Sequence, residues 1–117
     1  GVFDSGSNSF TFSWDITDNL IGDPSAPGAH IHEGAAGVAG PIVLPFDMDA
    51  WDLSGSAVWT NMSTDEVLSL MNGNLYVNFH TTDFPGGEIR GQIEKVPAPG
   101  GAALLGIAGL AAARRRR

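Results

Sequence analysis

The chain has 117 residues, enough for one domain, and 43% of them are hydrophobic. It contains no cysteine, which excludes disulfides and thiolate metal sites. All 13 acidic residues lie within the first 95 positions, where Arg90 and Lys95 are the only basic residues, so repulsion from phosphate argues against nucleic-acid binding. The 16 glycines and 7 prolines favour short strands joined by turns.

The first half of the chain predicts strands of period two. In residues 9–16 the side chains of Phe10, Phe12, Trp14 and Ile16 share one face. A turn before this strand makes residues 1–3 the end of an earlier one, and the start at Gly1 rather than methionine predicts a missing N-terminal piece, such as a signal peptide. Further short strands are predicted at 29–32, at 42–46, ending or interrupted at Pro45, and at 56–60.

One short helix follows, with Ser63 and Glu66 forming a capping box and Gly73 stopping it. Residues 75–80 alternate again, which places Leu75, Val77 and Phe79 towards the core and Tyr76, Asn78 and His80 away from it. A turn at 83–87 joins them to a last strand, 88–96, with Ile89 and Ile93 inward. We therefore expect an all-β antiparallel sandwich of immunoglobulin-like or Greek-key type with one connecting helix.

Two segments carry a resemblance to a known family. Residues 29–43, AHIHEGAAGVAGPIV, and residues 73–93, GNLYVNFHTTDFPGGEIRGQI, resemble the two signatures of CHRD (chordin) domains, with Glu33 where glycine is common. With the strand at 9–16 the likeness covers residues 1–95. It implies an exported module without an assigned activity or catalytic residues. The growth-factor antagonism of chordin itself is not expected of a bacterial chain, which lacks that partner.

The C-terminal residues 96–117 form a second unit that is similar to a PEP-CTERM sorting signal. A Pro-rich spacer precedes an apolar stretch at 102–113, expected to be a tail helix, and a terminal basic run. The resemblance implies an exosortase-like processing enzyme, transient insertion in the inner membrane, and release to the cell surface or exterior. Ala98 replaces the glutamate of the motif, which leaves a rhombosortase- or archaeosortase-like route open. The expected signal residues are Val96, Pro97, Ala98, Pro99, Arg114, Arg115, Arg116 and Arg117.

The three histidines of the chain, His30, His32 and His80, all lie in the two signature segments. Imidazole ligands suit copper and zinc, so a three-histidine metal site is one hypothesis. The His-x-His strand is also similar to that of copper–zinc superoxide dismutase, which adds dismutase-like redox chemistry to this alternative. The other hypothesis is structural: the rings hydrogen-bond to loop carbonyls and brace the loop at 34–41.

Other charged residues indicate structural roles. Arg90 is expected either to pair with Glu88 or to hold a loop through Asp83 or Glu33. The acidic residues Asp47, Asp49 and Asp52 lack the glycine and distal glutamate of a calcium loop, so a solvated loop is predicted.

No catalytic motif is recognisable in the chain. The function we expect is therefore non-catalytic: a surface or matrix module that binds exopolysaccharide or another surface protein. The alternative is a small copper- or zinc-binding protein.

Overall fold

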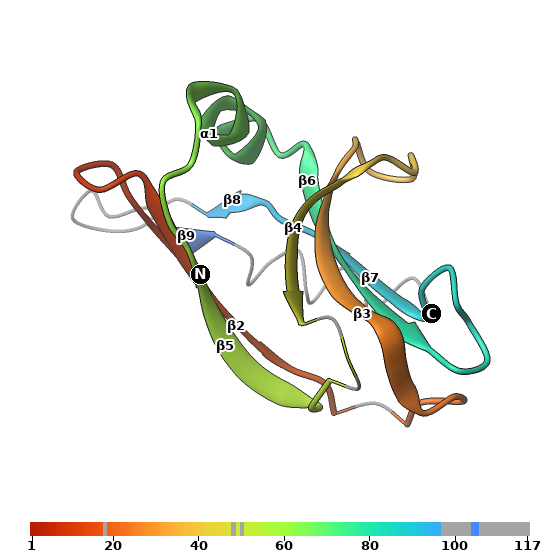
Figure 1. The fold of residues 1–117 in the computed structure, drawn as a ribbon. Helices are drawn as coiled ribbons and strands as arrows, with labels where there is room; N and C mark the ends of the chain where they lie inside the picture. The colour runs from red at the N-terminus through yellow and green to blue at the C-terminus, as the bar shows by residue number, and fades with distance from the viewer. Residues whose placement is uncertain (18, 48, 50, 97–103, 106–117) are drawn as a thin grey trace.

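The structure is a computed structural model that describes residues 1–17, 19–47, 49, 51–96 and 104–105. In this part the chain forms two antiparallel sheets and one short helix (Figure 1). The elements are β1 (Val2–Asp4), β2 (Ser9–Asp15), β3 (Pro24–Glu33), β4 (Ile42–Asp47), β5 (Ser54–Trp59), α1 (Thr64–Met71), β6 (Leu75–Thr81), β7 (Ile89–Gln92), β8 (Lys95–Val96) and β9 (Leu104–Leu105).

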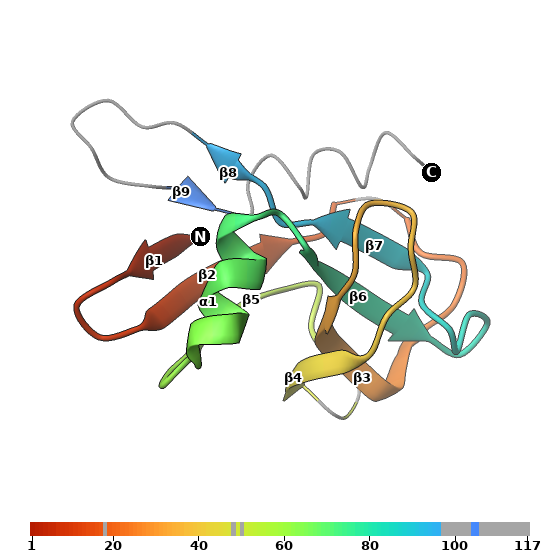
Figure 2. The ribbon, with the colours of Figure 1, turned by 90° about the horizontal axis from the view of Figure 1, so that it is seen from above.

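The first sheet has the strand order β5-β2-β1-β9-β8 and the second has the order β4-β3-β6-β7. The predicted hairpin is confirmed, because β6 pairs antiparallel with β7 and places Phe79 opposite Ile89. In the second sheet β3 and β6 are the central strands, and β6 makes Tyr76 the neighbour of His32. Figure 2 shows α1 lying across one end of the two sheets.

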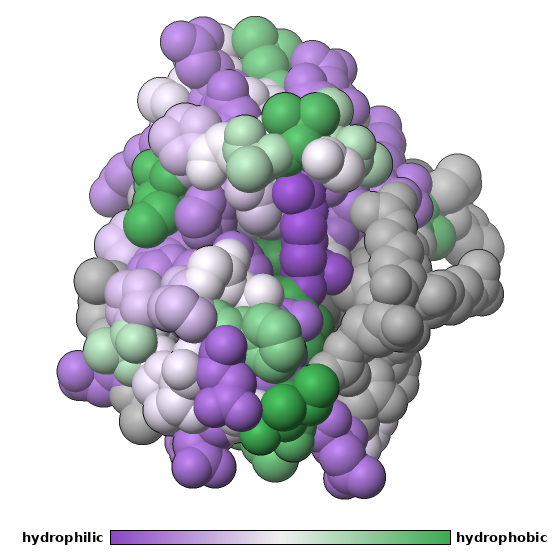
Figure 3. All heavy atoms as spheres, turned by 90° about the vertical axis from the view of Figure 1, so that its right-hand side faces the viewer, coloured by the Kyte–Doolittle hydropathy of each residue, from purple (hydrophilic) through white to green (hydrophobic). Residues whose placement is uncertain are grey.

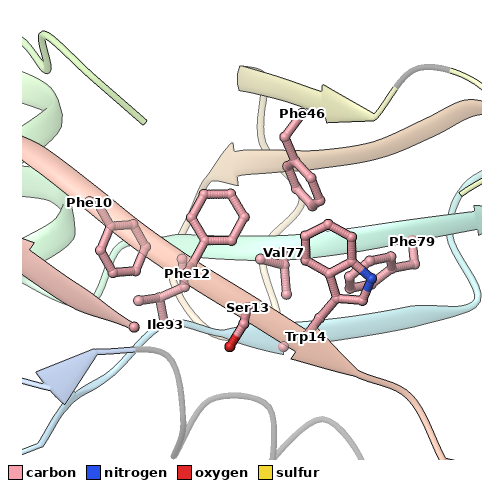
Figure 4. Close-up of a pocket in the computed structure, with 10 residues that line it drawn as sticks. Phe10, Phe12, Ser13, Trp14, Phe46, Val77, Phe79 and Ile93 are labelled. Carbon is pink, nitrogen blue, oxygen red and sulfur yellow. The ribbon is translucent and has the colours of Figure 1, made fainter. Parts of the chain in front are cut away.

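The core lies between the sheets. Eight of the side chains predicted to share the inward face are buried, whereas Ile16, just beyond β2, is only half-buried. The eight are Phe10, Phe12, Trp14, Leu75, Val77, Phe79, Ile89 and Ile93. Aromatic rings join the sheets, with Trp14 and Phe79 centroids 6.0 Å apart and Phe12 and Phe46 centroids 5.0 Å apart. They line an apolar cavity of about 20 Å³, roughly one water in size (Figure 4). Because its lining offers few polar partners, this cavity is part of the packing rather than a binding site.

The predicted capping box of α1 is confirmed. The Ser63 hydroxyl accepts a hydrogen bond from the Glu66 backbone at 3.2 Å, and the Glu66 carboxylate accepts one from the Ser63 backbone at 2.7 Å. Asn72 is the C-cap and Gly73 follows with φ +72°, a conformation that favours glycine.

Two strand predictions needed correction. The last strand, expected at 88–96, is two strands, because Ile93 and Glu94 separate β7, which belongs to the second sheet, from β8, which belongs to the first. The strand at 42–46 does not end at Pro45 but continues to Asp47. The predicted interruption is present as a register shift between the pairs His30–Pro45 and Ala29–Asp47, and proline is tolerated in β4 because this is an edge strand.

The tail prediction is largely untested. Pro97, Ala98, Pro99 and Arg114 to Arg117 lie outside the described residues, as does most of the expected tail helix. For Leu104–Leu105 the expectation was wrong: these residues form β9, which pairs with β1 and β8. Within the described residues no helix has the length and apolarity needed to cross a membrane.

Candidate metal centre

The three histidines lie on the outer face of the second sheet. Along β3, Ala29 and Ile31 point into the core, so His30 and His32 project from the opposite face. His80 projects from the same face of the adjacent strand β6, two residues beyond Asn78, which pairs with His30. The period of two and the pairing of two neighbouring strands therefore bring side chains 50 residues apart together.

This outer face is buried, which the sequence did not predict. The exposed fraction is 0% for His30, 9% for His32 and 6% for His80. Tyr76 and Asn78 also point away from the core as predicted, yet they are 3% and 9% exposed. Figure 3 views the molecule from the right-hand side of Figure 1, where the described surface mixes hydrophilic residues with scattered hydrophobic ones.

The loop at 34–41 covers much of this face through its backbone. The Gly40 N–H donates to the Tyr76 hydroxyl at 3.0 Å. The Gly34 carbonyl accepts from the Gln92 side chain at 2.9 Å. A Cβ at position 40 would overlap the carbonyl of Glu33, so glycine is required for this close approach. The glycines of the first signature segment are thus what lets the loop lie close to the sheet.

Hydrogen bonds orient the three rings. His32 Nδ1 contacts the Gly40 carbonyl at 2.9 Å, and His80 Nδ1 contacts the Pro85 carbonyl at 2.8 Å. A carbonyl can only accept, so both Nδ1 atoms carry the proton and both Nε2 atoms of the neutral rings keep a lone pair. His30 Nδ1 lies 3.0 Å from His80 Nε2 and is therefore the donor of that bond.

Two ring nitrogens remain without a hydrogen-bond partner. These are Nε2 of His30 and Nε2 of His32, both fully buried. Buried polar atoms in native proteins nearly always have a partner, so an unpaired imidazole nitrogen needs an explanation. Because Nδ1 of each of these two rings carries the proton, each unpaired Nε2 has a free lone pair. Imidazole binds a metal through such a lone pair.

The electrostatics of the cluster favour the neutral form of His30. The pKa of His30 lies below its usual 6.5, first because burial disfavours the charged form and then because His80 and His32 would repel a second positive charge. The Pro27 backbone partly offsets this by stabilising the proton. Neutral rings are the state required for ligation.

The spacing of the nitrogens suits one ion. One nitrogen from each histidine lies within 4.8 Å of the other two. For three atoms with a longest separation of 4.8 Å, some point lies no more than about 2.8 Å from each of them, because this bound is the longest separation divided by √3. The bonds in zinc–imidazole sites are shorter, about 2.0–2.1 Å. Among the described residues this is the only group of histidines, cysteines and carboxylates with such spacing. Because the lone pair of His80 Nε2 accepts the hydrogen bond from His30, an ion bound by all three rings would have to replace that bond.

The side chains of His32, Tyr76 and Arg90 form a stack that extends from the three-histidine cluster. This stack was not predicted from the sequence. The rings of His32 and Tyr76 stack with centroids 5.0 Å apart, and the Arg90 guanidinium lies 3.5 Å from the centroid of the Tyr76 ring. The prediction that Arg90 holds a loop is confirmed, but the acceptor is the Ala35 carbonyl at 2.9 Å rather than a carboxylate. The alternation of residues 75–80 indicated which side chains lie on the outer face of the strand. It did not indicate which segments of the chain cover that face.

The structural alternative for the histidines also has support, because His32 does bond to a carbonyl of the loop at 34–41. The two roles are compatible, since each ring has a second nitrogen.

The Glu88 carboxylate has a structural role. It accepts hydrogen bonds from the backbone of Ile21 and Gly22 and from Thr81, which ties the start of β3 to β7.

Comparison with known proteins adds the family. The CHRD domain profile matches residues 2–93, more than half of the chain. The chain belongs to the CHRD domain family. The matched region contains all three histidines and both loops that contact them. No match was found among curated proteins or among solved structures.

Proposed function

We propose that this CHRD domain is a metal-binding module in which His30, His32 and His80 hold one copper or zinc ion. The observation that carries the proposal is the convergence of three buried imidazoles that leaves two lone pairs without a partner. Metal-ligating histidines usually donate their other N–H to a carbonyl or carboxylate. His32 and His80 already do so, through Gly40 and Pro85.

The other function predicted from the sequence, binding of exopolysaccharide or a surface protein, has weaker support. An open groove of about 420 Å³ is lined by Asp23, Trp51 and Asp52 among others. Sugar-binding sites usually present an exposed aromatic ring, but Trp51 is only 2% exposed. The geometry therefore favours the metal over a glycan as the ligand.

The setting we propose is the cell surface or the exterior, reached by processing of the tail at 96–117. Its support is the order of spacer, apolar stretch and arginines, which suits transient membrane insertion with the arginines left in the cytoplasm. Deletion of Arg114 to Arg117 in cells should leave more uncleaved precursor, measured by immunoblot of membrane and medium fractions. Unchanged processing would contradict the proposal. We propose binding without catalysis, and dismutase-like activity is the alternative to assay on metal-loaded protein.

Metal content tests the main proposal. The full chain, purified without chelators, should carry or take up about one copper or zinc ion per chain, measured by elemental analysis and calorimetric titration. His30→Ala and His80→Ala should lower the affinity strongly. Asn78→Ala is the control, because it removes a buried side chain of the same face that has no ring nitrogen. Affinity should fall as pH drops through about 6.5, since protons compete for the same nitrogens.

The outcomes separate the two roles of the histidines. If the wild type binds no metal at micromolar concentration, or if both histidine variants bind as well as the wild type, the site does not exist. The rings would then be loop braces, and the same variants would lower thermal stability alone.

A further inference from the structure

The charges around the three-histidine site bear on which ion it selects. All three ligands are neutral, because the proton on Nδ1 of His32 and of His80 is held by a backbone carbonyl. His30 stays neutral whichever of its nitrogens binds. An occupied site would therefore carry the full charge of its ion, whereas zinc sites built with thiolate or carboxylate ligands neutralise it.

Nearby side chains do not supply the missing negative charge. No carboxylate of the described residues belongs to the cluster. Glu33 follows His32 in sequence, but its carboxylate accepts a hydrogen bond from Ser69 at the surface, 3.1 Å away. The other acidic residues, which contribute to the net charge of −7, are not part of the cluster and act on it only as charges screened by salt.

The closest charged group on the stack is positive. Tyr76 belongs to β6, which lies between β3, carrying His32, and β7, carrying Arg90. The guanidinium and the imidazole therefore flank the Tyr76 ring from opposite sides, at 3.5 Å and 5.0 Å from its centroid. The Nε atom of Arg90 is buried without a hydrogen-bond partner, but the side chain is only half-buried and its hydrogen bond to the Ala35 carbonyl is exposed, so water screens part of this charge.

We infer that the site selects a monovalent ion, Cu(I), over Zn(II); this inference rests on the proposed metal-binding function. The free-energy cost of moving an ion out of water rises with the square of its charge, and no anionic ligand neutralises the ion here. Repulsion by Arg90 rises in proportion to the charge. Three nitrogen ligands can satisfy Cu(I), whereas four-coordinate zinc would need a water in addition to the three ligands that the cluster supplies.

The test compares ions of different charge on the full chain. Cu(I), supplied as its acetonitrile complex under argon, and Zn(II), supplied as chloride, are each titrated against a chelator of known affinity. Arg90→Gln removes the charge, Arg90→Lys keeps it without the planar stack, and Lys95→Gln is the control, an exposed cation of the other sheet. Circular dichroism confirms the fold of each variant.

The Coulomb energy between Arg90 and the ion is proportional to the charge of the ion, so it is twice as large for Zn(II) as for Cu(I). If Arg90→Gln raises the affinity for Cu(I) about threefold, it should therefore raise the affinity for Zn(II) about tenfold. Arg90→Lys and Lys95→Gln should change the Cu(I)-to-Zn(II) affinity ratio less than twofold. Equal effects of Arg90→Gln on both ions, or tighter binding of Zn(II) than of Cu(I) by the wild type, would overturn the inference and leave the metal site standing. Binding of neither ion would instead remove the proposed function.

Discussion

His30 and His80 meet through Nδ1 and Nε2, 3.0 Å apart, while the other nitrogen of His80 is held by the Pro85 carbonyl. This chain of two hydrogen bonds fixes the neutral tautomer of both rings. In this arrangement Nδ1 of His30 is the donor and Nε2 of His80 is the acceptor.

The first prediction concerns acid. The pKa of His30 is lowered in the folded state, mainly by burial, so the unfolded chain takes up a proton near pH 6.5 while the folded chain does not. The free energy of unfolding is therefore highest above pH 6.5. It decreases as the pH falls below 6.5, with a slope of at most about 1.4 kcal/mol per pH unit. Urea unfolding of the metal-free chain between pH 5 and 8, with His30→Gln as the comparison, measures it. An equal slope in both proteins would contradict the assignment to His30.

The second prediction concerns the turn between β6 and β7. Gly87 has φ +114°, and a Cβ there would overlap the side chain of Asn78. Gly87→Ala should therefore cost about 1–3 kcal/mol of unfolding free energy. Gly86→Ala is the matched control, because a Cβ at Gly86 meets no atom within 4 Å. Similar losses in both variants, measured by chemical denaturation, would show that the steric argument is wrong.

The third prediction tests how the core supports the site. The indole N–H of Trp51 donates to the backbone carbonyl of His80 at 2.7 Å in a buried position. Trp51→Phe leaves that carbonyl without its partner, which should cost about 1–3 kcal/mol beyond the loss of packing. Trp59→Phe trims a buried indole of the other sheet and measures the packing part alone. Equal destabilisation of the two variants would mean that the hydrogen bond contributes little.

The fourth prediction concerns α1. Ser63→Ala removes the acceptor of the capping box and should lower the unfolding free energy by about 1 kcal/mol. Thr64→Ala, one position along at an exposed site, should have a smaller effect. Thermal unfolding followed by circular dichroism compares them, and the interpretation fails if Thr64→Ala is the more damaging change.

Part of this structure could be predicted because the information is local. Alternation with period two requires only neighbouring residues, and it identified the inward faces of β2 and β6. The capping box is a four-residue pattern and was equally accessible. The proximity of His80 to His30 could be predicted only by knowing that β3 and β6 are neighbours. Local sequence patterns do not indicate which strands pair.

The burial of Tyr76 and Asn78 could not be predicted in the same way. Alternation separates two faces of a strand, but all seven residues of β6 are buried because the loop at 34–41 and the turn at 82–88 cover the second face. That loop makes its contacts through carbonyl and amide groups, as Ala35 does with Arg90. Backbone groups are present at every position, so they leave no signal in the residue types. The glycines that allow the close approach were visible, although their purpose was not.

The carbonyls that orient His32 and His80 have a consequence for how such domains can diverge. Gly40 and Pro85 hold the rings through main-chain oxygen atoms. Exchange of exposed side chains along these loops should leave both anchors in place. An insertion or deletion of a single residue would instead carry an anchor several ångströms away from its ring. Among related chains, loop length is therefore expected to track the presence of the histidines more closely than loop composition does.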